Sequence, residues 1–456
     1  MKSSRSEVLT RVYAVPELRF EREDKHSLTS FGGLVIYQSL FSRLKIKGRL
    51  RNCLGHLRRS AIFRPQVIVF WLIIHLILGF RKLRDRDYYC DDPMVCRVVG
   101  VRRLPDVATI SRSLASMDEQ AILQLREMAR LLVCERLVQE KLARVTLDFD
   151  ASVFSTRRHA QGTAIGFNKK KKGARSYYPL FCTIAQTGQF LDLHHRPGNV
   201  HDSNGSIAFA RGCFRVIREH LAQAVLESRL DSAFFDEKLI EEFADDGVEF
   251  TISVPFERLT QLKKLIENRQ RWHKIDETWS YFELDWKPKS WSRQYRFLFV
   301  RQKRKQPIKG ELQLDLFEPR SFEYEYKVIV TNKGIAAKKV IAFHHGRGSQ
   351  EGIFAEAKSH CQMEYVPVRG LYGNQCFCLA AILAHNLTRE MQIQAKERER
   401  GTTEKRTHLW VFESLRTLRE RVVRRAGRFI NPQRHLTLVM GANEAVQSEL
   451  HHYMAL

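Results

Sequence analysis

The segment 144–254 alternates between apolar strands and helices, and this alternation constrains the fold more than any other feature of the sequence. The second and third strands are separated by Gln-Thr-Gly-Gln, a typical hairpin turn. Three antiparallel strands followed by alternating helix and strand predict an α/β fold, in which a mixed sheet is flanked by helices. The predicted strands are 144–150, 177–185, 190–194, 226–231 and 248–254, and the predicted helices are 203–225 and 236–246.

Acidic residues stand at the ends of two of these strands. Alternation places Asp148 and Asp150 on one face of the first strand, and Asp231 ends the fourth. If these strands are neighbours, Asp150 and Asp231 lie side by side, where active sites of open α/β sheets gather. Acids on one face are costly unless a positive group neutralises them, and a divalent metal takes carboxylate oxygens. A strand end that reaches solvent is the alternative interpretation.

A second polar stretch spans residues 344–358. If it is helical from about Ser349, Glu351 and Lys358 lie almost two turns apart and share a face, with Arg347 one turn before Glu351. The apolar residues at 353, 354 and 357 fall on the opposite side and would hold the helix against a core. A carboxylate between two cations suits a site that holds a metal and a polyanion. A solvated face with helix-spaced ion pairs is the alternative.

The charge balance indicates the partner. The chain of 456 residues has 76 Lys and Arg against 51 Asp and Glu, a net charge of +25, which points first to nucleic acid. A membrane surface is the competing polyanion, but the most apolar run, 67–80, is too short to span a bilayer and predicts a buried helix. The N-terminus has no secretory signal, and nine cysteines without repeated CxxC pairs predict reduced thiols in a cytosolic protein without a zinc site.

The regions around the α/β segment have distinct compositions. Residues 1–30 predict a basic N-terminal arm, and 31–140 predict a helical DNA-binding domain. Within it, residues 94–112 predict a helix-turn-helix whose second helix exposes Arg112, although ordinary helix packing explains the pattern equally simply. Residues 396–456 predict a basic C-terminal helical region.

Residues 255–325 interrupt the α/β pattern, so they predict a β-rich insertion between the two parts of a catalytic core, 141–254 and 326–395. Trp286 and Trp291 stand among cations there, which suits stacking on distorted DNA, or alternatively the core of a small β subdomain. A basic loop between the first two strands would add contacts to the DNA backbone, and a solvated loop is the alternative. Its cations are Lys169, Lys170, Lys171, Lys172 and Arg175.

The order of three acids resembles a known family. Asp150 in Leu-Asp-Phe-Asp-Ala-Ser, Asp231 in Arg-Leu-Asp-Ser-Ala-Phe-Phe and Glu351 in Gly-Arg-Gly-Ser-Gln-Glu resemble the DDE transposases of bacterial insertion sequences. The final acid is similar to the branch with the spacing Tyr-x2-Arg-x3-Glu-x6-Lys, although His344 stands in the tyrosine position. The likeness covers roughly residues 140–390.

The resemblance implies a ribonuclease H-like mixed sheet with an inserted β domain, and a cut-and-paste reaction. In that reaction, metal-dependent cleavage at the element ends frees a 3′-hydroxyl that attacks target DNA. Asp150, Asp231 and Glu351 would be catalytic and would hold two Mg²⁺ ions, replaceable by Mn²⁺, with Asp150 as the bridge and Asp148 as its substitute. The phosphates would be held by Arg347, Lys358 and, in place of the tyrosine, His344.

The implied partners are double-stranded DNA with terminal inverted repeats, target DNA and a second copy of the chain on paired ends, in the bacterial cytoplasm at the nucleoid, with no membrane. Two other functions stay open: a catalytically inactive DNA-binding protein derived from a transposase, and a ribonuclease H-like nuclease that cuts without strand transfer.

Overall fold

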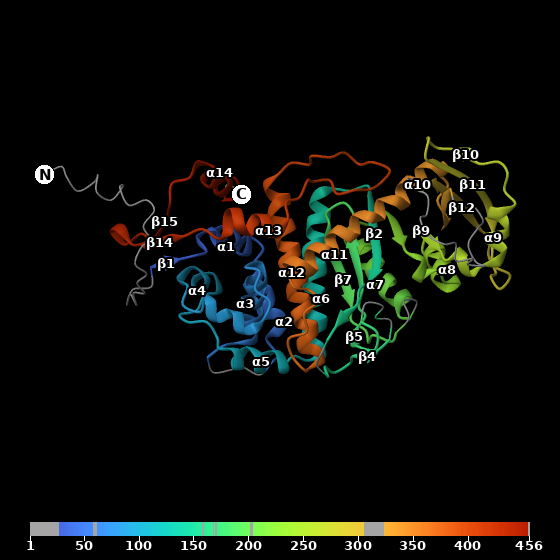
Figure 1. The fold of residues 1–456 in the computed structure, drawn as a ribbon. Helices are drawn as coiled ribbons and strands as arrows, with labels where there is room; N and C mark the ends of the chain where they lie inside the picture. Colours follow the sequence, from blue (N-terminus) through green and yellow to red (C-terminus); the bar gives the residue numbers. More distant parts are fainter. Residues whose placement is uncertain are drawn as a thin grey trace.

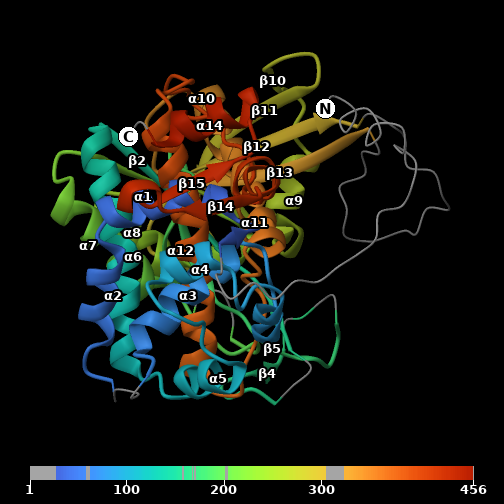
Figure 2. The same cartoon turned by 90° about the vertical axis from the view of Figure 1, so that its left-hand side faces the viewer.

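The computed structural model describes residues 27–57, 62–156, 159–166, 168, 171–200, 204–304 and 323–454. The molecule is elongated, with a helical region at one end, a large sheet in the middle and the inserted strands at the other end (Figure 1). Figure 2 views the same arrangement from the helical end. The predicted 1–30 arm lies almost wholly outside the described residues.

The centre of the molecule is one nine-stranded sheet in the order β10-β11-β12-β13-β9-β8-β2-β6-β7. The pairs β2–β8 and β8–β9 are parallel and the other pairs are antiparallel. The sequence-based prediction of a mixed α/β sheet is therefore confirmed. The strands are β2 (Arg144–Ala151), β6 (Leu180–Ile184), β7 (Gln189–His194), β8 (Val225–Leu230), β9 (Glu249–Val254), β10 (His273–Lys274), β11 (Trp279–Trp286), β12 (Tyr295–Lys303) and β13 (Tyr324–Thr331).

The two faces of this sheet differ in polarity. Because side chains alternate along β2, Val145, Leu147 and Phe149 face an apolar core. The helices α7 (Ser206–His220) and α8 (Glu237–Asp245) contribute to the same core. The opposite face is apolar at its two ends and polar in the middle, on β2 and β8. It is covered by α10 (Ala337–His345), α11 (Ser349–His360) and α12 (Leu371–Ala395), which pack on β12, β9 and β7 or on the helices beside them.

The insertion continues the central sheet. Its strands β10, β11 and β12 pair outward from β13, and α9 (Thr260–Glu267) packs beside them. Aromatic residues hold this part together: the rings of Phe282 and Phe299, on facing strands, stack with centroids 4.4 Å apart. Three short strands form a separate small sheet near the basic loop, β3 (Phe154–Ser155), β5 (Arg175–Tyr177) and β4 (Ala164–Ile165).

The N-terminal region is helical, as its sequence predicts. The apolar run at 67–80 forms α3, which is buried almost all round, and no helix among the described residues is long and apolar enough to cross a membrane. A helix, a turn and a second helix follow at the predicted place: Gly100 has φ +86° after α4, and Asp106 caps α5 by accepting from the Thr109 N–H. The helices are α1 (Val35–Arg43), α2 (Ile46–Leu54), α3 (Pro65–Ile77), α4 (Pro93–Val99), α5 (Val107–Ala115) and α6 (Glu119–Glu140).

The prediction of a helical C-terminal region is wrong in part. Helices α13 (Leu415–Leu418) and α14 (Glu444–Met454) flank two strands, β14 (Gly427–Ile430) and β15 (Thr437–Met440), and β14 also pairs with β1 (Leu28–Thr29). Both strands carry β-branched or aromatic residues, which favour strands, and Pro432 stands in the connection between them. A basic composition alone did not reveal this.

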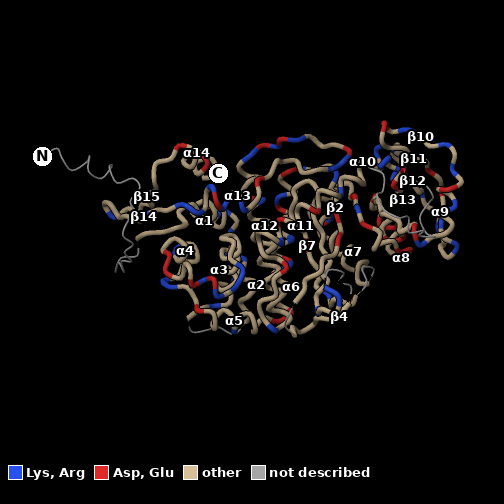
Figure 3. The backbone as a smooth tube through the Cα atoms, viewed as in Figure 1, with Lys and Arg blue, Asp and Glu red and all other residues tan. Residues whose placement is uncertain are grey.

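The segment 396–410 joins α12 to α13 by arching over the polar part of the sheet (Figure 1). Its backbone is anchored to the β6–β7 turn, because the Leu409 N–H donates to the Gln186 carbonyl (2.9 Å) and His408 Nδ1 lies 2.7 Å from the Ala185 carbonyl. The arch is rich in charged residues, with Lys and Arg interspersed with Glu (Figure 3).

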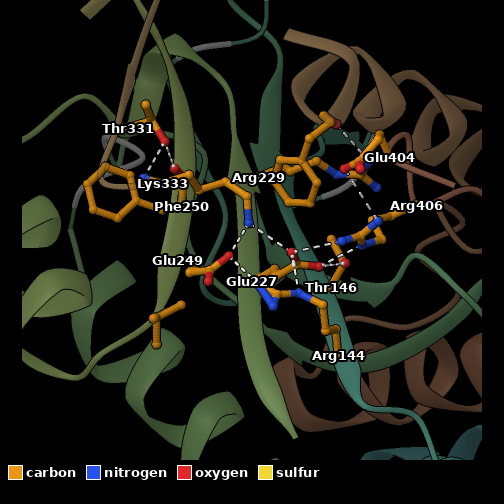
Figure 4. A network of polar contacts seen from close by, with 12 residues as sticks. Arg144, Thr146, Glu227, Arg229, Glu249, Phe250, Thr331, Lys333, Glu404 and Arg406 are labelled. Atoms are coloured by element: carbon orange, nitrogen blue, oxygen red, sulfur yellow. Dashed lines mark hydrogen bonds and ion pairs between the residues drawn. The ribbon is translucent and has the colours of Figure 1, made fainter. Parts of the chain in front are cut away.

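A buried charge network fills the polar middle of the sheet (Figure 4). Glu227 on β8 is fully buried and accepts hydrogen bonds from three cations and a hydroxyl. The donors are Lys333 Nζ (2.8 Å), Arg406 Nε (2.9 Å), Arg144 Nε (3.0 Å) and Thr146 Oγ1 (3.0 Å). Burial alone would raise the pKa of Glu227, but the hydrogen bonds and charges of Arg406 and Lys333 outweigh it and lower the pKa to about 2.

This network predicts a defined acid sensitivity. A carboxyl whose pKa falls from 4.5 to about 2 on folding stabilises the fold above pH 4.5 and loses that contribution as the pH falls towards 2. The contribution is on the order of 3 kcal/mol. Glu227→Gln is expected to lower the free energy of unfolding at pH 7 by about 3–5 kcal/mol, because buried cations lose their partner. It should also flatten the pH dependence below pH 4.5, measured by urea denaturation.

Glu219→Gln is the matched control, because Glu219 pairs with Arg215 on the surface of α7. Its effect should stay within about 0.5 kcal/mol. An equal loss of stability in both variants would show that the Glu227 network contributes no more than a surface ion pair.

Candidate active site

The pairing of β2 with β8 sets the positions of the candidate acids. Thr146 lies opposite Glu227, and Asp148 lies opposite Arg229, in parallel register. Side chains two residues apart share a face, so the next pair on this face is Asp150 and Asp231. The two aspartates therefore stand at the same level, at the carboxyl ends of neighbouring strands, as the sequence predicts.

A single guanidinium joins these two aspartates. Arg347 Nη2 lies 3.3 Å from Asp150 Oδ2 and 3.6 Å from Asp231 Oδ2. Each carboxylate also accepts a nearby backbone N–H, Asp150 from Ala151 and Asp231 from Ala233. Within the described residues, Arg347 Nε is buried without a hydrogen-bond partner, so the guanidinium is only partly satisfied here.

The predicted helix from Ser349 is confirmed as α11, and it is fixed against the strand that carries Asp150. Gln350 is buried, and its Nε2 donates to the Asp148 carbonyl (2.8 Å) and to Thr183 Oγ1 (3.0 Å). The residues at 353, 354 and 357 are buried, as expected. Glu351 is exposed, one turn after Arg347, and Lys358 is partly buried in the last turn.

Asp148 has a role different from the predicted one. Both its oxygens accept from Arg229, from Nε and Nη2 at 2.6 Å each, and both side chains are fully buried. Burial raises the pKa of Asp148, while the charge and hydrogen bonds of Arg229 oppose that rise. In this arrangement the Asp148 carboxylate is a partner of Arg229 inside the fold, whereas Asp150 faces the site.

His344 is also placed differently from the prediction. It is buried at the end of α10, with Nε2 2.9 Å from Ser253 Oγ and Nδ1 3.0 Å from Thr251 Oγ1. Burial first, and then the charge of Arg347, hold its pKa well below the ordinary value, so the ring is neutral. Both ring nitrogens are engaged with β9, so His344 fastens α10 to the sheet and is not placed to bind a phosphate here.

The remaining predicted DNA contacts are spread over the molecule. Lys169 and Lys170 lie outside the described residues, whereas Lys171 and Lys172 are exposed and Arg112 is exposed on α5. The guanidinium of Arg175 donates to the hydroxyl and to the carbonyl of Thr163, so it links β5 to the residue that precedes β4.

The two tryptophans belong mainly to the core. Trp291 is 8% exposed and packs on Phe235, with ring centroids 4.9 Å apart. Trp286 is partly buried and meets Phe297 edge to face. Of the two interpretations, the core of the inserted strands is therefore the one that applies to Trp291. Base stacking on Trp291 is not possible in this arrangement.

A cavity of about 430 Å³ opens beside α11, between this helix and β9 and β13. Arg347 and Glu351 line it, and Arg347 also contacts the paired aspartates, which do not line the cavity themselves. Its other polar and aromatic lining residues are Ser232, Ser253, Phe256, Glu257, Trp279, Gln302, Tyr326, Lys327, His344 and His345. The cavity walls thus combine acidic, cationic and aromatic side chains.

Comparison with known proteins decides the family. The family model described as transposase DDE domain group 1 matches residues 19–456. The chain belongs to this DDE transposase family. A search of curated proteins found no match. Among solved structures, a cryo-EM structure of a piggyBac transposase synaptic complex with hairpin DNA matches with a TM-score of 0.38 and 10% identity, covering 87% of this chain and 80% of that one.

In this DDE transposase the two aspartates fit a divalent cation, because they present hard carboxylate oxygens that already share one positive group. The third acid is separate: no group of three His, Cys, Asp or Glu side chains lies close enough to hold a metal within the residues that the structure describes. The structure thus brings together Asp150, Asp231 and Arg347, and it places Glu351 on the adjoining helix face.

The sequence-based prediction missed two residues that support the candidate site. Arg229 shares a face with Asp231 by simple alternation, so its position beside Asp148 was readable once the two strands were taken as neighbours. Gln350 precedes the predicted glutamate and carried no such signal, because the carbonyl that it contacts belongs to a strand about 200 residues earlier.

The contact of Gln350 with β2 can be tested by stability. Gln350→Met keeps the size of the side chain but removes the donor to the Asp148 carbonyl and to Thr183. It is expected to lower the free energy of unfolding by about 1–3 kcal/mol, because two buried acceptors lose a partner. Gln294→Met is the control, since the exposed Gln294 donates to the Asp285 carbonyl on the surface. Equal effects in urea denaturation would contradict the assigned role.

Proposed function

We propose that this chain is a cut-and-paste transposase of a bacterial insertion sequence, which cleaves the element ends and joins the freed 3′-hydroxyls to target DNA. The observation that carries the proposal is the pairing of Asp150 and Asp231 on neighbouring parallel strands, 3.3 and 3.6 Å from one nitrogen of Arg347. Arg347 is followed one turn later by Glu351, in the spacing of the Tyr-Arg-Glu-Lys branch. Membership of the DDE transposase family supports the same reaction class.

The proposal includes a ribonuclease H-like core. It is supported by the order β7-β6-β2-β8-β9, in which three antiparallel strands adjoin two parallel ones and β2 lies centrally. The substrates are double-stranded DNA with terminal inverted repeats and a target duplex, and a second copy of the chain acts on the paired ends. The net charge of +25 suits a protein that holds several duplex arms.

Three acids have distinct roles in this proposal. Asp150 and Asp231 would hold divalent ions, and Glu351 would complete the site from α11. Mg²⁺, for which Mn²⁺ can substitute, would activate the attacking oxygen and stabilise the leaving oxygen. The chain's own cations then hold DNA: Arg347 offers a fork of donors to a phosphate, and Lys358 offers a point charge.

Arg347 links DNA binding to ion binding. Its guanidinium and a divalent ion would use the same carboxylate oxygens of Asp150 and Asp231, so the arginine must leave before an ion takes both. A DNA phosphate provides a partner for the released guanidinium, including its buried Nε. DNA would therefore favour ion binding by withdrawing Arg347 from the aspartates.

Loss of one aspartate is expected to abolish cleavage. Asp231→Asn keeps an oxygen that can accept from the Ala233 N–H but removes the charge that holds an ion. Cleavage of DNA carrying the element's terminal repeats should fall by more than about 100-fold, the upper end of what loss of a mere supporting residue costs. DNA binding, measured by gel shift, should be retained.

Asp285→Asn, on the exposed side of β11, is the control and should cleave like the unchanged chain. Equal cleavage by Asp231→Asn and the unchanged chain would refute the assignment of the site. Cleavage without any joined product in a strand-transfer assay would instead identify a nuclease. Binding without cleavage under any divalent ion would identify an inactive derivative.

The competition at Arg347 gives a separate prediction. Arg347→Gln removes the charge that the two aspartates share, so the DNA-free chain should bind Mn²⁺ at least about tenfold more tightly, the equivalent of roughly 1.4 kcal/mol. The same variant should bind element ends more weakly. Electron paramagnetic resonance titration of free Mn²⁺ measures the first effect. An unchanged or weaker Mn²⁺ affinity would contradict the competition.

A further inference from the structure

We propose that Arg229 is the positioning residue of the site, because it fastens together the separate segments that carry the acids and Arg347. This inference rests on the proposed function, since the geometry that it maintains is that of an ion-binding site. Arg229 lies on β8, is fully buried, and precedes Asp231 by two residues. It has no route to substrate itself and acts only through its partners.

The guanidinium of Arg229 makes contacts in three directions. Nε and Nη2 donate to the two oxygens of Asp148, and Nη1 donates to the Phe343 carbonyl (3.1 Å) and the Lys405 carbonyl (2.7 Å). The cation also lies over the Phe343 ring, 5.3 Å from its centroid. Asp148 and Phe343 are buried, and the hydrogen bond to the Lys405 carbonyl is partly buried although Lys405 itself is exposed. These acceptors take the place of the water that a charge loses on burial.

Two of these partners, Asp148 and Phe343, lie a short distance along the chain from a site residue. Asp148 precedes Asp150 on β2 by two residues, and Phe343 precedes Arg347 by one helical turn. Arg229 itself precedes Asp231 by two residues. Movement of the guanidinium would therefore change the spacing between the two aspartates and between them and α11, and the geometry of an ion site depends on such spacing.

The segment 396–410 completes this arrangement. It brings the Lys405 carbonyl to Arg229, and a Cβ at residue 346 would lie 1.8 Å from that carbonyl oxygen and 2.3 Å from Arg229 Nη1. Gly346 has an ordinary helical φ of −60°, so its lack of a side chain serves this close approach and not a backbone turn. The arch thus meets the residues that support the site at two points, Arg229 and Gly346.

Arg229→Lys separates positioning from charge. Lysine keeps the positive charge beside Asp148, but its single ammonium cannot reach two carboxylate oxygens and two carbonyls together. The dissociation constant for Mn²⁺, measured by electron paramagnetic resonance on the full chain, is expected to rise at least tenfold. Electrostatics cannot account for such a change, because the charge is the same.

Arg406→Lys is the matched control. Arg406 also forms an ion pair with a residue of β8, Glu227, which lies four residues before Asp231. The partners of Glu227 on β2 are Arg144 and Thr146, at least four residues before Asp150, so the pair is remote from the site. The Arg406→Lys variant is expected to lose similar stability in urea while keeping Mn²⁺ affinity within threefold. Equal rises in both variants, or no rise in Arg229→Lys, would overturn the positioning role while leaving the proposed function standing. An unchanged chain that binds no Mn²⁺, with or without element-end DNA, would overturn both.

Gly346→Ala gives a second test that leaves Arg229 in place. The added methyl must displace the Lys405 carbonyl or the guanidinium, so Mn²⁺ affinity should again fall at least tenfold. Gly352→Ala, where a methyl meets nothing within 4 Å, is the control on the same stretch and should bind like the unchanged chain. Unchanged affinity in Gly346→Ala would contradict the role assigned to this contact.

Discussion

Compensation of buried charge between β2 and β8 is the constraint on which the rest of the structure depends. The two strands are neighbours in the middle of a nine-stranded sheet, and the face that they share is covered by helices and by the 396–410 arch. Charges taken out of water there cost several kcal/mol each unless they are paired and hydrogen-bonded. The ion pair of Asp148 with Arg229 meets this requirement, and so do the ion pairs of Glu227 with its cations. The polar face is therefore stable inside the fold.

The register between β2 and β8 also positions the residues of the candidate site. Because the pairs alternate strictly along two parallel strands, the last members, Asp150 and Asp231, emerge together where the strands end and solvent begins. The buried pairs behind them fix the two strands against sliding, since a shift by one residue would turn every paired charge into the apolar face. Stability of the core and alignment of the site therefore come from one set of residues.

Local patterns in the sequence predicted much of this, and contacts between distant segments account for the rest. Alternation identified the faces of β2, and the apolar spacing in α11 identified its buried side, because both depend only on near neighbours. The position of His344 is set by Ser253 and Thr251, and that of Trp291 by Phe235. No local sequence pattern connects these partners. The strands near the C-terminus were missed because composition, and not periodicity, was used there.

Arg347 shows how one residue can serve both folding and reaction. Two carboxylates that meet at a strand end repel each other, and the guanidinium between them supplies the positive charge that this arrangement requires. Its partners are imperfect, at 3.3 and 3.6 Å with a buried Nε unpaired, so little is lost when a better anion arrives. A phosphate provides that anion and leaves the aspartates in need of another cation. In the proposed function, the protein's own neutralising charge would make ion binding conditional on DNA and so restrain cleavage until a duplex is in place.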